Sequence, residues 1–196
     1  MNHGHFPVLP PDPWLARPLR SNLCRAHRSW LTTPDSLTAA LRTVCSRFQV
    51  RILEPGARFP FPDEAGLLGI SCRQPVWCRE VLLCDGALPL VFARSLLPLK
   101  DLPRAWPTLD ARDPRPLGER LFTDPQVRRT PLHFRKLPRY HPLSLRLRRF
   151  PLDLPPWARR SLHVRQGAPL LVTEIFLTLP PRPADPAQAL SFFASP

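Results

Sequence analysis

Alternating apolar residues predict a central hairpin in this chain. The run 76–84 leads into an Asp85-Gly86 turn, and a second apolar run, 88–97, follows at once. An Asp-Gly pair between two such runs is a strong hairpin signal. Because successive side chains of a strand point to opposite faces, one face of the first run collects Trp77, Arg79, Val81 and Leu83. A charge, that of Arg79, is therefore expected among apolar neighbours.

A later run repeats this pattern with the opposite charge. Residues 170–177, LLVTEIFL, place Glu174 on an apolar strand face, and Arg94 lies between Phe92 and Leu96 in the hairpin. Burying an ion costs several kcal/mol unless the ion is paired. These charges predict a buried ion pair or a polar cavity, and the alternative is that the strands show these faces to water.

The rest of the pattern predicts a mixed fold with few helices. Thr33-Pro34 resembles a helix start, and Gln166-Gly167 separates two closing strands. Helices are predicted over 34–48 and 116–122, and strands over 49–53, 67–71, 143–147, 160–165 and 168–177. Short strands with tight turns and no strand-helix-strand alternation favour an α+β class, with an antiparallel sheet covered on one face by helices.

Length and composition predict one folded domain with two tails. The chain has 196 residues, of which 29 are prolines. Residues 1–27 are expected to form a proline-rich arm, 28–179 the domain and 180–196 a proline-rich tail. No apolar run is long enough to span a bilayer, and the first residues lack the apolar segment of a secretory signal, so a cytoplasmic location is expected.

The chain is strongly basic, with 28 basic against 15 acidic residues and a formal charge of +13. Residues 128–165 contain a single acidic residue, Asp153, which is the best argument for a nucleic-acid partner. Only Lys100 and Lys136 are lysines, however, and an excess of arginine and proline also follows from GC-rich codons. No known DNA- or RNA-binding motif is present, so nucleic-acid binding is not the favoured function.

Several common kinds of site are disfavoured. The five cysteines contain no Cys-x-x-Cys pair, and no His-carboxylate cluster supports a metal, so no metal is expected. Gly-x-Gly-x-x-Gly, Gly-Lys-Ser/Thr and Gly-x-Ser-x-Gly motifs are absent. The backbone amides near Gly118, at the start of the helix predicted over 116–122, are free to meet one anionic group.

Three segments together resemble the bacterial chorismate pyruvate-lyases: 77–84, 116–122 and 169–177. Residues 29–38 resemble them as well, and the likeness covers about 28–179. It implies an enzyme of ubiquinone biosynthesis that converts chorismate to 4-hydroxybenzoate and pyruvate without a cofactor or metal. It also implies a sheet of about six antiparallel strands with helices on one side, enclosing the ligand.

The resemblance carries the ligand contacts to Arg79, Glu174, the backbone of Leu117, and Leu37, where the family often has methionine. Chorismate is a dianion, and its ring carboxylate suits a planar guanidinium, so Arg79 is the expected clamp. Glu174 is expected to bond the ring hydroxyl, either as a proton carrier or only to orient the substrate. Arg94 is a lesser candidate for the side-chain carboxylate.

Two other functions remain open beside a monomeric lyase. Domains of similar fold serve as effector-binding parts of transcription regulators, which makes a sensor of aromatic acids one alternative. A nucleic-acid-binding protein built on residues 128–165 is another. A domain whose strand charges merely pair with each other would have no site at all.

Overall fold

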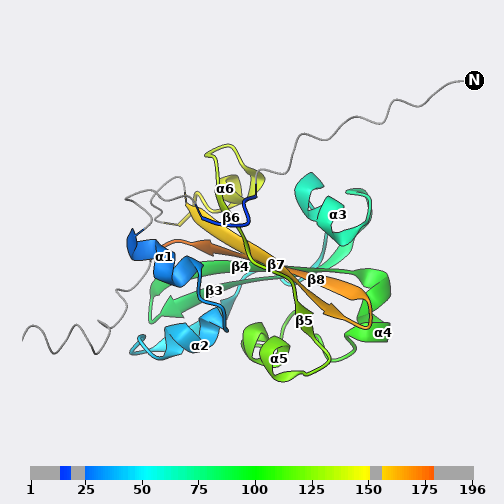
Figure 1. The fold of residues 1–196 in the computed structure, drawn as a ribbon, viewed down its shortest axis with the longest axis horizontal. Helices are drawn as coiled ribbons and strands as arrows, with labels where there is room; N and C mark the ends of the chain where they lie inside the picture. Colours follow the sequence, from blue (N-terminus) through cyan, green and yellow to red (C-terminus); the bar gives the residue numbers. More distant parts are fainter. Residues whose placement is uncertain (1–13, 19–24, 151–155, 179–196) are drawn as a thin grey trace, which may run out of the picture.

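In the residues that this computed structural model describes, 14–18, 25–150 and 156–178, an antiparallel sheet of eight strands forms the centre of the molecule (Figure 1). The strands are β1 Phe48–Ile52, β2 Gly56–Arg58, β3 Val76–Asp85, β4 Leu88–Pro98, β5 Arg128–Arg129, β6 His133–Lys136, β7 Trp157–Arg165 and β8 Ala168–Phe176. Their order is β1-β3-β4-β8-β7-β5, with β2 also paired to β3 and β6 to β7. The predicted antiparallel sheet is confirmed, with eight strands where about six were expected.

Two tight hairpins set the register of this sheet. Gly86 turns β3 into β4 with a φ of 57°, and the Asp85 carboxylate accepts a hydrogen bond from the backbone N–H of Arg47 at 2.7 Å. Between β7 and β8, Gln166 and Gly167 have φ values of 50° and 75°. Positive φ at both central residues defines the type I′ turn, whose twist suits a hairpin. Both predicted hairpins are confirmed.

Helices cover both faces of the sheet. They are α1 Arg25–Leu31, α2 Leu37–Arg42, α3 Pro62–Leu68, α4 Leu102–Ala105, α5 Leu117–Thr123 and α6 Pro142–Arg146, with a 3-10 helix, η2, at Leu99–Asp101. In Figure 1, α2 and α5 lie below the strands, and α3 and α6 lie above them. The α+β class is confirmed, but the prediction of helices on one face is incomplete. Residues 76–84 of β3 are buried on both faces, so each face needs a cover.

The helix predicted over 34–48 is shorter and begins later. Ser36 caps α2, because its hydroxyl accepts a hydrogen bond from the backbone N–H of Ala39 at 3.3 Å. The helix ends at Arg42, and Phe48 already belongs to β1, where it pairs with Asp85. The strand predicted over 49–53 is therefore confirmed to within a residue, and sheet pairing overrides the helical spacing of Phe48.

Two short segments predicted as strands are wrong. Residues 67–71 overlap the end of α3, where Gly69 provides the left-handed C-cap. Residues 143–147 belong largely to α6, in which Leu143 and Leu147 are buried together while Leu145 is 44% exposed. Four-residue spacing places Leu143 and Leu147 on one side of a helix, so the alternation of leucine and arginine concealed a helical face.

The ends of the chain are described only in part. Trp14 is buried, and Leu15 exchanges two backbone hydrogen bonds of 2.8 Å with Phe134 of β6. Of the arm predicted over 1–27, only residues 14–18 and 25–27 are described, and α1 begins at Arg25; the tail predicted over 180–196 lies outside the described residues. The domain boundaries therefore stay predictions. Among the described residues, no helix has the length and hydropathy needed to cross a membrane.

Candidate functional site

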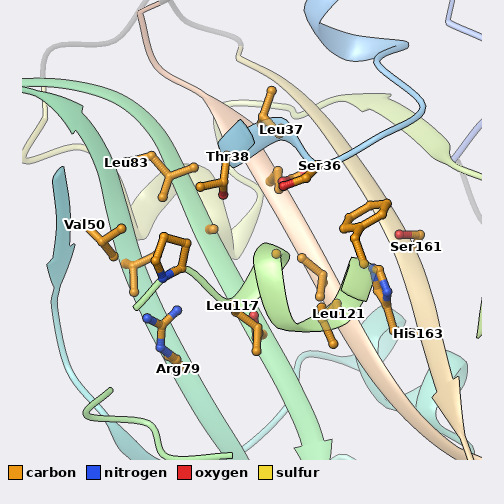
Figure 2. A pocket seen from close by; sticks show the side chains of 18 of the residues that line it. Ser36, Leu37, Thr38, Val50, Arg79, Leu83, Leu117, Leu121, Ser161 and His163 are labelled. Atoms are coloured by element: carbon orange, nitrogen blue, oxygen red, sulfur yellow. The ribbon is translucent and has the colours of Figure 1, made fainter. Parts of the chain in front are cut away.

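A cavity lies between one face of the sheet and the helices α2 and α5 (Figure 2). Its empty space amounts to about 570 Å³, part of which opens to solvent. Apolar side chains of the strands and helices form much of its wall. The four residues that the sequence suggests as ligand contacts all line this cavity: Leu37, Arg79, Leu117 and Glu174.

Strand register explains why these residues meet. One row across the sheet consists of Arg79, Ser95, Val172 and Ser161, and the next row consists of Val81, Ala93, Glu174 and Arg159. Residues opposite one another on neighbouring strands point to the same face. Arg79 and Glu174 are two strands and two residues apart, so their Cα atoms are separated by about 12 Å. The two charges lie near the same chamber but do not pair with each other.

Arg79 is a buried cation without a carboxylate partner among the described residues. Its side chain is only 4% exposed, and its Nη2 donates hydrogen bonds to the backbone carbonyls of Asp113, at 2.8 Å, and Arg115, at 3.0 Å. Burial lowers the pKa of the Arg79 guanidinium, which nevertheless stays ionised as arginine does in proteins. The two carbonyls fix its orientation and leave other N–H groups for an anionic ligand.

The start of α5 lies beside Arg79. Pro116 precedes the helix and supplies no side-chain cap, so the first backbone N–H groups of α5, beginning with Leu117, have no partner within the helix. Gly118 lets α5 approach α2 closely, since an added Cβ would lie 3.0 Å from the Ser36 hydroxyl. The short helix thus brings backbone donors to the cavity wall, as the sequence predicts.

Glu174 is held by an arginine that the sequence analysis missed. The Nε of Arg159 donates to the Glu174 carboxylate at 2.5 Å, and its Nη1 donates to the carbonyls of Trp30, Leu31 and Thr33 at 3.2, 3.1 and 2.9 Å. Arg159 is 1% exposed and the Glu174 side chain 15%. This arginine ties the end of α1 to the carboxylate, while Oε1 of Glu174 has no hydrogen-bond partner among the described residues.

The far wall of the cavity holds two further groups that the sequence analysis missed. Arg129 of β5 donates from Nε to the Ser161 hydroxyl at 3.0 Å and from Nη1 to the carbonyl of Pro34. His163, which pairs with Arg129 in register, is 3% exposed and packs edge-on against Phe122. Burial, together with the charge of Arg129, lowers the pKa of His163 to about 4. Its Nδ1 is buried, and no described residue forms a hydrogen bond with it.

Arg94 does not belong to this site, and its assignment as a substrate contact is wrong. It points to the opposite face of the sheet, where it pairs with Glu64 at 2.9 Å and Glu80 at 2.6 Å. A β-bulge between Leu83 and Cys84 shifts the β3–β4 register by one residue. Without that shift Arg94 would lie opposite Arg79, because each step in register moves a side chain to the other face.

Many arginines of the basic segment are engaged inside the protein. Arg159 and Arg160 are buried, Arg160 pairs with Asp63 at 3.0 Å, and Arg146 pairs with the buried Glu80. Among the described residues, no group of three or more His, Cys, Asp or Glu side chains is placed to hold a metal ion. The expectation of a reaction without metal or cofactor stays a prediction.

The arrangement suits a small cyclic acid. A cation and backbone N–H groups lie on one side of an apolar chamber, and a carboxylate oxygen lies on the other. Arg79 and the backbone of α5 can bind a ring carboxylate, and Glu174 can accept a hydrogen bond from a hydroxyl across the ring.

Comparison with known proteins points in the same direction. A sequence model of the family described as "Chorismate lyase" matches residues 14–182. A protein of Aromatoleum aromaticum named "Probable chorismate pyruvate-lyase" is 46% identical over 172 residues, 85% of this chain and 92% of the relative. An Azoarcus protein of the same name is 43% identical over 173 residues, with 85% and 90% covered.

A solved structure shares the fold. The structure titled "Crystal structure of PhnF C-terminal domain" matches with a TM-score of 0.52 over 73% of this chain and 87% of that one. At 18% sequence identity this likeness concerns the fold alone.

Proposed function

This chain belongs to the chorismate lyase family, and we propose that it acts as a chorismate pyruvate-lyase. In this reaction the C3–O bond of chorismate breaks, the C4 hydrogen leaves, and the enolpyruvyl methylene gains a hydrogen. The products are 4-hydroxybenzoate and pyruvate. Aromatisation of the ring makes the elimination strongly favourable, so the main task of the protein is to orient the substrate and to place charge around it.

The observation that carries the proposal is the buried guanidinium of Arg79, which has no carboxylate partner in the described part of the chain and lies in a chamber that also contains Glu174. A buried cation without an opposite charge in contact is costly, and an anionic ligand offsets that cost. Arg79 with the first amides of α5 binds the ring carboxylate. A planar guanidinium can bind a carboxylate through two parallel hydrogen bonds, which fixes the plane of the ring as well as its position.

Glu174 completes the orientation from the other side of the ring. Arg159 holds one carboxylate oxygen of Glu174, so the remaining oxygen, Oε1, accepts the hydrogen bond of the C4 hydroxyl. This contact selects the ring orientation in which the C4 hydrogen and the C3 ether are placed for elimination. If the C4 hydrogen moves to the methylene in one concerted step, no general base is needed. If it moves through Glu174, Oε1 must lie near that hydrogen. Both routes therefore require the same orientation of the ring relative to Glu174.

The wider setting follows from the same proposal. We expect the protein to work as a monomer in the cytoplasm, without metal or cofactor, and to supply 4-hydroxybenzoate for ubiquinone biosynthesis. The apolar wall that accepts the ring of the substrate also accepts the aromatic product.

The direct test is turnover. Purified protein is incubated with chorismate, with and without a chelator, and 4-hydroxybenzoate and pyruvate are measured separately. We expect equal amounts of both products and no effect of the chelator. Binding of 4-hydroxybenzoate without any turnover would overturn the proposal in favour of a sensor of aromatic acids. Salt-sensitive retention of DNA that Arg79→Ala leaves unchanged would favour a nucleic-acid partner.

A further inference from the structure

One wall of the cavity takes no part in the contacts proposed for the ring carboxylate and the C4 hydroxyl. It is built by β5 and β7 and carries Arg129, Ser161 and His163. In Figure 2, Ser161 and His163 lie across the pocket from Arg79, with α5 between them in the view. These polar groups face a chamber that is otherwise largely apolar, and two of them are only partly satisfied within the protein.

Arg129 carries a charge that no described carboxylate neutralises by direct contact. A guanidinium has five N–H donors, and in Arg129 the Nε donates to the Ser161 hydroxyl and Nη1 donates to the carbonyl of Pro34. Nη2 has no hydrogen-bond partner among the described residues, and the guanidinium lies over the Phe122 ring, 5.2 Å from its centroid. The nearby charge of Glu174 acts on Arg129 through space only. The two bonds fix the guanidinium at the cavity wall with donors left for a ligand.

His163 supplies a second, independent indication of a ligand. His163 is 3% exposed, yet within the described part of the chain its Nδ1 has no hydrogen-bond partner. A buried polar atom without a partner is rare, because it loses its bonds to water and gains none. With a pKa of about 4, the imidazole is neutral near pH 7 and offers one donor and one acceptor nitrogen. His163 lines the cavity, so a ligand held at this wall would lie beside the imidazole.

The chemistry of the substrate indicates what this wall binds. Chorismate has two carboxylates, and the proposed function uses Arg79 for the one on the ring. The enolpyruvyl ether is attached to C3, next to the C4 hydroxyl that Glu174 contacts. Its carboxylate therefore lies towards the Glu174 side of the ring, which is the side of β7 and β5. We propose that Arg129, with His163 beside it, binds the carboxylate of the enolpyruvyl side chain.

This inference rests on the proposed function and gives it a second anchor. With the ring carboxylate at Arg79 and the side-chain carboxylate at Arg129, rotation about the C3 ether is restricted, so the methylene stays near the C4 hydrogen. The product 4-hydroxybenzoate lacks the side chain. The wall therefore contributes to binding of substrate and of released pyruvate, but not to binding of the aromatic product.

The experiment compares substrate with product in the same variants. Arg129→Met removes the cation, Arg129→Lys keeps it, and Arg128→Met alters the exposed neighbour on β5 as a matched control. For each variant, kcat/KM for chorismate and the Kd for 4-hydroxybenzoate are measured, with thermal melting to verify folding. Loss of a charge-assisted contact predicts a fall of about 10- to 100-fold in kcat/KM for Arg129→Met, with Kd changed less than about threefold.

Partial recovery of kcat/KM in Arg129→Lys, with kcat/KM and Kd unchanged in Arg128→Met, would support a role for the charge of Arg129. Equal losses towards chorismate and 4-hydroxybenzoate would overturn the inference, because Arg129 would then only maintain the shape of the pocket. Unchanged kcat/KM in Arg129→Met would overturn it as well.

If the wild-type protein turned over no chorismate, the proposed function would fail on its own. The ratio of the Kd values for chorismate and 4-hydroxybenzoate would still test whether Arg129 binds the side-chain carboxylate. A preference for chorismate that Arg129→Met abolishes would support this role, and a preference that this variant leaves intact would refute it.

Discussion

Replacing Arg159 by methionine tests the most connected interaction in the site. The guanidinium of Arg159 is the direct partner of Glu174 and also donates to three carbonyls at and beyond the end of α1. Methionine keeps much of the side-chain length and its apolar packing but removes every hydrogen bond. The variant leaves a carboxylate without its partner in a site where its side chain is only 15% exposed.

The expected loss of stability is large. Removing one partner of a buried ion pair typically costs about 3–5 kcal/mol, because the remaining charge stays desolvated. For a domain of this size, each kcal/mol lowers the melting temperature by about 2–4 °C. Arg159→Met should therefore melt about 6–20 °C below the wild type. It should also lose activity, since Glu174 is then free to leave the position in which Oε1 meets the substrate.

A double-mutant cycle separates the pair from the carbonyl contacts. Glu174→Gln is combined with Arg159→Met, and the free energy of unfolding is measured for all four proteins by denaturant titration. We expect the double variant to be less destabilised than the sum of the single variants by more than about 1 kcal/mol. Arg42→Met breaks the exposed Arg42–Glu119 pair and should change little. A loss below about 1 kcal/mol in Arg159→Met, or strict additivity in the cycle, would refute the reasoning.

Three further predictions follow from the structure. His163 has a pKa of about 4 in the folded protein, below the ordinary value near 6.5, so the unfolded chain binds its proton first as the pH falls. The free energy of unfolding, measured by denaturant titration, should therefore fall by about 2–3 kcal/mol between pH 6.5 and 4. In His163→Phe this pH dependence should be weaker, and an equal dependence in the variant would contradict the prediction. Gly118→Ala should raise the KM for chorismate while the melting temperature changes little, because the added Cβ lies 3.0 Å from the Ser36 hydroxyl and displaces α5. An unchanged KM would contradict this close contact. Arg94→Met should lower the free energy of unfolding by about 3–5 kcal/mol, while kcat per folded molecule stays within about twofold of the wild type. A loss of kcat without a loss of stability would indicate that Arg94 does contact the substrate.

The sequence is sufficient to predict the central hairpin and its charged face. Period-two alternation places Arg79 and Glu174 on buried strand faces without any knowledge of the fold. The type I′ turn at Gln166-Gly167 also allows the partner of Glu174 to be predicted, because the register counted back from that turn places Arg159 opposite Glu174. That signal was hidden because the arginine-rich segment resembled a solvated face.

Other features depend on details that local patterns do not encode. The bulge at Leu83 and Cys84 moves Arg94 to the far side of the sheet, and a simple count from the Asp85-Gly86 turn puts it beside Arg79 instead. Arg129 lies on a strand of two residues, too short for any periodicity to reveal. The second helical layer follows from the burial of both faces of β3, and a single strand cannot indicate which segments will cover it.

The most direct test of the account is the activity of Arg79→Met. The variant removes the cation that is expected to bind the ring carboxylate, and Arg51→Met, on the exposed side of β1, serves as the matched control. With thermal melting showing both variants folded, the account predicts that Arg79→Met loses at least about 100-fold in kcat/KM for chorismate and binds 4-hydroxybenzoate weakly, while Arg51→Met resembles the wild type. Formation of 4-hydroxybenzoate by Arg79→Met at the wild-type rate would contradict it.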